Sequence, residues 1–227
     1  MIDFHTHILP GMDDGCKSVA ESLWMLRQEQ QQGVDAVVLT PHYYPWENSP
    51  EEFLARRSRA WEMLKQQLPE DAPQLFLGAE VHYFEGIGSS PRVQQLRISG
   101  TDLLLLEMPF SRWTERMVED LLECAAAPDI QVVLAHAERY FSLQPKAIWP
   151  RLRSSGIWIQ ANVSFFSSWK TRYQAMRMLQ RGEIQFLGSD CHRQHWRAPN
   201  WDTLPPKIAG NIQNTRHLKP AWETVQV

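Results

Sequence analysis

Seven short, mostly aliphatic runs recur along this chain of 227 residues, and segments long enough for a helix separate them. The runs occupy residues 1–5, 36–41, 75–81, 102–108, 131–136, 157–163 and 184–190. Continuous apolar character is typical of parallel strands whose two faces are covered. Seven consecutive β–α units predict a single α/β domain, a closed or nearly closed (β/α)7 barrel of the TIM-like kind. A doubly wound open sheet is the alternative.

Helix signals stand between these runs. Ser18 with Glu21, and Ser49 with Glu52, have the spacing of a capping box, and Pro50 suits the first helical position. Glycine enters the left-handed conformation easily, so three glycines are predicted to end helices: Gly33, Gly156 and Gly182. Four more helices are expected over residues 91–99, 114–127, 146–155 and 170–181.

Composition narrows the class of protein. The domain is expected to cover residues 1–204, and the polar, weakly patterned residues 205–227 are predicted to form a poorly ordered surface tail. A net charge of -3 argues against duplex nucleic acid as the main partner. The longest aliphatic run, residues 103–106, is too short to enter and span a membrane, and no signal peptide is evident. Three cysteines without zinc-type spacing predict a reduced, cytoplasmic setting.

Polar residues gather where the predicted strands end. They are His5, His7, His42, Glu80, Glu107, His136, Asp190 and His192. Parallel strands bring their carboxyl ends to one face, so these side chains are expected to converge on one site. Imidazoles and carboxylates without a thiolate cluster suit manganese, iron, zinc or cobalt in a reactive site more than a structural zinc. The set exceeds the needs of one tetrahedral ion, so two or three divalent ions with a bridging carboxylate are predicted.

These motifs resemble the PHP (polymerase and histidinol phosphatase) superfamily. More narrowly, the chain resembles the bacterial manganese-dependent protein-tyrosine phosphatases of capsular and extracellular polysaccharide synthesis. The resemblance covers about residues 1–200 and rests on the motifs at residues 3–15, 40–42, 78–80, 106–107, 135–139 and 188–192. A glutamate at position 107, where many members have histidine, favours the tyrosine-phosphatase branch.

The resemblance implies a distorted barrel with a trinuclear site. His5, His7, Glu80 and Asp190 would hold one ion. Glu80 would bridge to a second ion, also held by Glu107 and His136, and Asp14, His42 and His192 would hold the third. Manganese is the ion implied, with iron, cobalt, zinc and magnesium as alternatives. Arg139 and Arg197 would bind the phosphate, with Arg193 as a competitor for the second role. The implied substrate is a phosphotyrosine protein, with a bacterial tyrosine kinase as partner.

The chemistry of metal ions fits the implied phosphatase activity, because a hydroxide that bridges two cations can attack a phosphate ester. Arginines offset the charge on the oxygens of the ester. Two functions remain open beside it: a small-molecule phosphatase of the histidinol-phosphate type, and a non-catalytic metal-binding module. Cys191 and Arg197 have the Cys-x5-Arg spacing of cysteine-dependent phosphatases. The five intervening residues are bulky and lack glycine, however, so thiol catalysis is disfavoured.

Supporting residues are also predicted. His82 is expected to support a ligand, because metal-binding groups need hydrogen-bonded neighbours. Five aromatic residues follow strand ends and form either a rim that receives a phosphotyrosine ring or ordinary loop packing. They are Tyr43, Tyr44, Trp46, Phe110 and Trp113.

Overall fold

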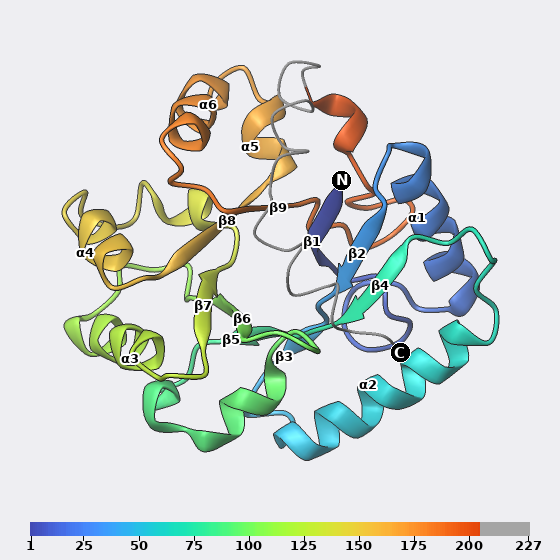
Figure 1. The fold of residues 1–227 in the computed structure, drawn as a ribbon, viewed down its shortest axis with the longest axis horizontal. Coiled ribbons are helices and arrows are strands. Elements are labelled where there is room, and N and C mark those ends of the chain that lie inside the picture. The colour runs from blue at the N-terminus through green and yellow to red at the C-terminus, as the bar shows by residue number, and fades with distance from the viewer. Residues whose placement is uncertain (205–227) are drawn as a thin grey trace.

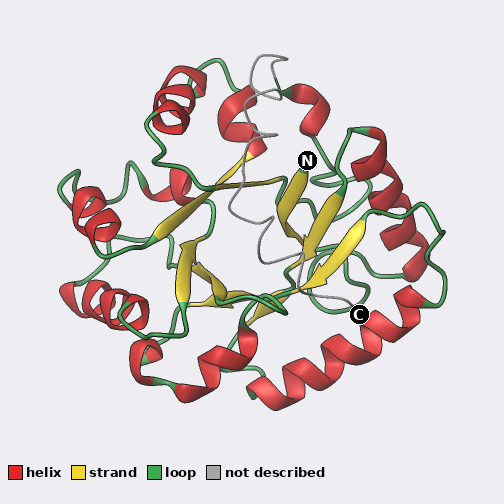
Figure 2. Cartoon of the chain, viewed as in Figure 1, coloured by secondary structure: helices red, strands yellow, loops and turns green. Residues whose placement is uncertain are grey.

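The aliphatic runs form parallel strands in a ring, with helices around the outside (Figure 1; Figure 2). The structure is a computed structural model, and it describes residues 1–204. One sheet has the order β1 (Ile2–Thr6), β2 (Ala36–Leu39), β4 (Gln74–Leu77). The other has the order β3 (His42–Tyr43), β5 (Glu80–His82), β6 (Leu103–Glu107), β7 (Gln131–Leu134), β8 (Trp158–Asn162), β9 (Phe186–Gly188).

Two predicted strands are each divided in the structure. The run at 36–41 gives β2, which ends at Leu39, and β3 follows directly after the run; the run at 75–81 gives β4 and β5. Pro41 interrupts the first, because proline has no N–H for the ladder. Gly78 interrupts the second where there is little room for a side chain: a Cβ there would lie 3.2 Å from Thr40 Cγ2. The two sheets therefore continue one into the other.

Backbone contacts between β1 and the segment after β9 close the ring. His5 accepts a hydrogen bond from the Asp190 N–H (2.9 Å), and the His7 N–H donates to the Cys191 carbonyl (2.9 Å). Thr6 and Cys191 form a parallel bridge. The expected distorted barrel is thus confirmed, and the open sheet is wrong, because an open sheet would leave its two edge strands apart.

The helices follow the predicted order with two differences. The structure has α1 (Val19–Gln31), α2 (Pro50–Lys65), α3 (Glu115–Ala125), α4 (Ile148–Ser154), α5 (Val163–Ser167) and α6 (Arg172–Gln180). The 3-10 helices are η1 (Ile87–Ser89), η2 (Pro91–Leu96), η3 (Ala137–Tyr140) and η4 (Trp201–Thr203). A full α-helix over 91–99 was therefore wrong, and the short α5 was not predicted.

Side-chain caps mark the starts of α1, α2 and α3. Ser49 and Glu52 form the expected capping box, whereas the box at Ser18 is incomplete because Glu21 accepts the Lys17 N–H (2.9 Å). The three predicted terminating glycines all have positive φ.

The ring interior is apolar at one end. A small cluster there draws members from β1, β2, β4, β6, β7 and β9, including Phe4 stacked on Phe186 at 4.1 Å. A larger apolar cluster fills the space between strands and helices. Burial of apolar surface drives this packing, so polar side chains are confined to the other, carboxyl end of the ring. Among the described residues, no helix has the length and apolarity needed to span a membrane. The tail at 205–227 lies outside the described residues, and the domain boundary at 204 stays a prediction.

Candidate metal centre

A bulge in β1 directs the first histidines into the ring. Between Asp3 and Thr6, β1 has one residue more than β2, because these two pair with Val37 and Leu39. A bulge re-aims the side chains that follow it. His5 therefore faces the ring interior, where its Nε2 lies 3.2 Å from His7 Nε2. Both rings are fully buried.

Glu80 lies at the centre of the converging side chains. Its Oε2 lies 3.1 Å from His5 Nε2 and 3.4 Å from His7 Nε2. Its Oε1 lies 2.9 Å from His136 Nε2, which is also 3.3 Å from Glu107 Oε1. With His42, whose Nδ1 lies 2.9 Å from Oε2, this carboxylate contacts four histidines, so it could bridge two ions.

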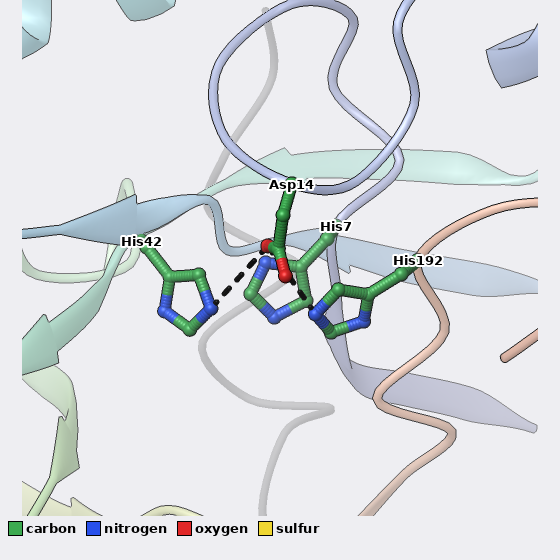
Figure 3. A group of neighbouring side chains, drawn as sticks. All are labelled: His7, Asp14, His42 and His192. Atoms are coloured by element: carbon green, nitrogen blue, oxygen red, sulfur yellow. Dashed lines mark ion pairs between the residues drawn. The ribbon is translucent and has the colours of Figure 1, made fainter. Parts of the chain in front are cut away.

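A second group lies toward solvent. It contains His7, Asp14, His42 and His192, whose ligand atoms lie within 4.8 Å of one another. Figure 3 shows Asp14 reaching between His42 and His192, with Asp14 Oδ1 3.7 Å and 3.5 Å from their Nε2 atoms. Two further groups of the same kind share members with it. They are His5, His7 and Asp190, and His42, Glu80 and Glu107. The structure therefore brings together all nine residues predicted as metal ligands.

Three histidines are fixed through the nitrogen that faces away from the site. His5 Nδ1 contacts Gln160 Oε1 (3.2 Å), His7 Nδ1 contacts Asp13 Oδ2 (2.7 Å), and His192 Nδ1 contacts the Asp190 carbonyl (2.9 Å). When Nδ1 donates to an acceptor, Nε2 is left with a free lone pair. All three Nε2 atoms point to the centre, which is the arrangement that a bound metal ion requires.

The donor set fits divalent cations by its charge as well as by its shape. Four carboxylates, Asp14, Glu80, Glu107 and Asp190, meet here, and such a crowd needs compensating positive charge. His42 Nδ1 and Glu80 Oε2 are 2.9 Å apart, yet both are buried without a hydrogen-bond partner among the described residues. Two buried ligand atoms this close, with no hydrogen bond between them, suit a cation that both can bind. The residues can hold an ion, and the donors are nitrogen and oxygen only.

Positive side chains control the ionisation of the central acids. Burial alone would raise the pKa of Asp190, but His5, His7 and Arg139 hold it well below its usual range. Burial opposes ionisation of Glu107 too, yet its contacts with His136 and His82 lower its pKa to about 2. These carboxylates are therefore charged at neutral pH and available as ligands.

The two predicted phosphate-binding arginines meet on one carboxylate. Arg139 and Arg197 both donate to Asp190 Oδ2, and each side chain is about one-third exposed (34% and 31%). Arg193 instead pairs with Glu21 at 3.4 Å. Three non-glycine residues here have positive φ: His136 (31°), Asp190 (54°) and Arg197 (58°). Such backbone is strained, and strain that persists is typical of functional sites.

The aromatic residues divide into a rim and a core. Tyr44 stacks on His42 (5.1 Å), Trp46 contacts Tyr44 (5.1 Å), and Phe110 stacks on His136 (5.5 Å). Trp46 and Phe110 are 64% and 52% exposed. Tyr43 and Trp113 are buried and pack against Phe53 and Tyr140, so loop packing is the right interpretation for these two.

Several supporting residues were not predicted. Gln160 Oε1 also accepts the His136 N–H (2.7 Å), and Asn162 donates to Asp190 Oδ2 (2.9 Å). Both lie on β8, the one strand from which no ligand was predicted, and they are two residues apart at its carboxyl end. That spacing was the available signal. The prediction for His82 is confirmed, because its Nδ1 contacts Glu107 Oε2 at 2.9 Å.

The sequence matches one family model, described as capsular polysaccharide synthesis, CpsB/CapC, over residues 1–216. The chain belongs to this family. The tyrosine-protein phosphatase YwqE of Bacillus subtilis (strain 168) is 29% identical over 203 residues, covering 85% of this chain and 77% of YwqE. The tyrosine-protein phosphatase CpsB of Streptococcus pneumoniae is 28% identical over 218 residues, covering 91% of this chain and 86% of CpsB.

A solved structure supports the same relationship at the level of the fold. It is described as one of the crystal structures of YwqE from Bacillus subtilis and CpsB from Streptococcus pneumoniae, unique metal-dependent tyrosine phosphatases. The TM-score is 0.76 at 20% identity, over 98% of this chain and 93% of that chain. The resemblance seen in the motifs is confirmed, and so is the barrel.

Proposed function

We propose that this CpsB/CapC family member is a metal-dependent tyrosine-protein phosphatase that acts in capsular or extracellular polysaccharide synthesis. One observation carries the proposal: two arginines share the Oδ2 atom of Asp190, whose Oδ1 atom faces the histidine cluster. A phosphate placed against the arginines would thereby also lie against the ions. The names of YwqE and CpsB, both tyrosine-protein phosphatases, supply the reaction.

The proposed ligand sets follow the contacts around Glu80 and the groups of converging atoms. His5, His7, Glu80 and Asp190 would hold one ion, and Glu80, Glu107 and His136 would hold a second. Asp14, His42 and His192 would hold the third, with a ring nitrogen of His7 within 4.8 Å of their ligand atoms. We propose that the ions are manganese. Nitrogen and oxygen donors suit manganese, as they suit several other divalent ions that a cell supplies.

Ions bound there supply Lewis acidity, which activates a water molecule and withdraws charge from the phosphoryl oxygens. The chain's own residues position the substrate. The planar guanidinium groups of Arg139 and Arg197 each offer paired N–H donors to phosphoryl oxygens, and Asp190 orients both groups. Phe110 and Trp46 are exposed at the mouth, where a phenyl ring can stack. A phosphoserine has no ring to fill this rim.

Hydrolysis of a phosphotyrosine peptide, before chelation, after chelation and after manganese is added back, tests the proposal. We expect activity to disappear and return, with phosphoserine peptide and histidinol phosphate as poor substrates. Preferred hydrolysis of histidinol phosphate would support the small-molecule phosphatase instead. Bound metal without turnover of any phosphoester would leave only a metal-binding module.

The cellular setting is proposed on the same basis. We propose a cytoplasmic location and a tyrosine kinase as the phosphorylated partner, in line with the capsule-synthesis family. Cell fractionation and co-purification with phosphotyrosine proteins test these two points.

A further inference from the structure

A groove outside the barrel lies between α4 and α6, and the phosphatase site does not use it. Its volume is about 510 Å³. Figure 1 shows α4 and α6 side by side next to β8. The groove also includes Phe141, two residues after the phosphate-facing Arg139. The groove thus begins at the segment that carries Arg139.

The two walls of the groove carry the same kind of side chain. Tyr173, Arg177 and Arg181 are four residues apart and so lie along one side of α6. Arg177 lies over the Tyr173 ring at 5.7 Å, and Tyr173 is 74% exposed. The wall formed by α4 and the residues just before it also has an aromatic ring between two cations. These residues are Lys146, Trp149 and Arg153.

Charge in the groove is strongly one-sided. Four cations line it against a single acid, Glu183, which pairs with Arg153 at 4.0 Å. The whole chain, in contrast, has a net charge of -3. The groove thus concentrates positive charge, with ring faces between the charges, on an otherwise acidic protein. Arginine binds carboxylates in pairs of hydrogen bonds, and the rings suit aromatic or aliphatic side chains.

The chain's own tail does not match this groove. Residues 205–227 contain Lys207, Arg216 and Lys219 against one acid, Glu223, so their charge has the same sign as the groove. A membrane surface also fits poorly, since cations and rings here line a concavity, whereas a lipid surface needs them on a protruding face. An extended acidic peptide with aromatic residues satisfies both charge and shape.

We propose that the α4–α6 groove is a docking site for an acidic, aromatic-containing peptide segment of the protein substrate. This proposal rests on the proposed protein-phosphatase function. A second point of attachment raises the effective concentration of phosphotyrosine at the metal centre. The proposal predicts that acidic sequence outside the phosphotyrosine lowers KM for a protein substrate. It predicts no effect of that sequence on kcat.

The test uses a fluorescent, glutamate-rich copolymer of glutamate and tyrosine, and the full-length protein. Arg177→Glu combined with Arg181→Glu reverses two exposed charges on α6. Arg59→Glu combined with Lys65→Glu is the matched control, because both residues are exposed on α2, on the far side of the barrel (Figure 1). Fluorescence anisotropy should show about 10-fold weaker copolymer binding for the groove variant and little change for the control.

Kinetics separates docking from chemistry. With the tyrosine-phosphorylated copolymer, the groove variant should raise KM about 10-fold, while hydrolysis of p-nitrophenyl phosphate stays at the wild-type level. Equal copolymer binding by the groove variant and the control would overturn the proposal. The proposal would also be overturned if the groove variant bound the copolymer normally but lost binding to phosphatidylglycerol vesicles. That result would assign the groove to lipid. If the wild type hydrolyses no phosphoester, the proposed function fails, but binding of the unphosphorylated copolymer still decides the groove.

Discussion

Two buried polar clusters both draw residues from β1 and from the segment that follows β9, and they behave in opposite ways. The inner cluster faces the ring interior and includes His5 and Asp190. The outer cluster faces α1 and consists of Asp3, Glu29 and Cys191, whose ligand atoms also lie within 4.8 Å of one another. Asp3 lies two residues before His5, and Cys191 follows Asp190, so residues close together in the chain enter different environments.

The protonation of the acids differs between the clusters. In the inner cluster, imidazole and guanidinium groups hold the pKa of Asp190 well below its usual range despite burial. In the outer cluster, burial and the neighbouring Asp3 raise the pKa of Glu29 well above its usual range, and burial raises the pKa of Asp3. Burial is common to both, so the cationic neighbours make the difference. The inner acids are charged and can act as ligands, whereas burial favours the protonated form of Glu29.

Asp190→Asn should have the largest effect. The amide keeps the size of the side chain but removes the charge that orients Arg139 and Arg197 and that faces His5 and His7. We expect kcat for a phosphotyrosine peptide to fall about 100- to 1000-fold, as when one preorganised charge-stabilising group is lost. Steady-state kinetics with metal analysis checks this. Near-normal kcat would mean that Asp190 is only structural, as the outer acids are.

Gln160→Leu should have the next largest effect, although Gln160 is not a ligand. Its Oε1 accepts from His5 Nδ1 and from the His136 N–H, and so fixes two ligands at once. We expect manganese affinity to weaken about 10- to 100-fold, as is usual for groups behind a metal ligand. Titration of the chelated protein with manganese measures this. Gln160→Glu keeps the acceptor and should restore most of the affinity; if it fails to do so, orientation of His5 is not the cause.

The ring of strands and the inner cluster were largely predictable from the sequence. The aliphatic runs indicate the strands, and the polar residues at the ends of these runs indicate the cluster. Aliphatic runs specify buried parallel strands, and polar residues at their carboxyl ends must converge. The division of two strands at Pro41 and Gly78 was less accessible. It depends on the exact approach of Thr40 and Ile98 to Gly78, which no local pattern reports.

The outer cluster was not predicted at all. Glu29 occurs in a helix whose sequence, with three neighbouring glutamines, suggests an exposed position, yet its side chain is fully buried. The bulge between Asp3 and Thr6 decides which face each side chain takes, and a bulge shifts the simple alternation of a strand. Gln160 was also missed. It acts by orienting other residues, and an amide side chain in a sequence does not indicate such a role.

Glu29→Gln should change stability and leave turnover alone. The free pKa of glutamate is near 4.5, and folding raises it, so ionisation of the unfolded chain lowers stability as pH rises above about 4.5. Glutamine cannot ionise, and its amide can still donate to Asp3. We expect equal melting temperatures near pH 4 and a higher melting temperature for the variant at pH 8. Thermal melts across this range check it, and a less stable variant at pH 8 would show that Glu29 is charged in the folded protein.

Cys191→Ser should have the smallest effect on turnover, and it decides between metal and thiol chemistry. Cys191 faces the outer cluster, where burial raises the pKa of its thiol well above the usual range. A thiol that stays protonated is a poor nucleophile, and its Sγ lies 3.5 Å from Glu29 Oε1, away from the arginines that face the phosphate. We expect kcat/KM to change less than about 2-fold, with no loss of activity in iodoacetamide at neutral pH. Loss of activity in a folded, manganese-loaded variant would bring Cys191 into the reaction and would end the distinction between the two clusters.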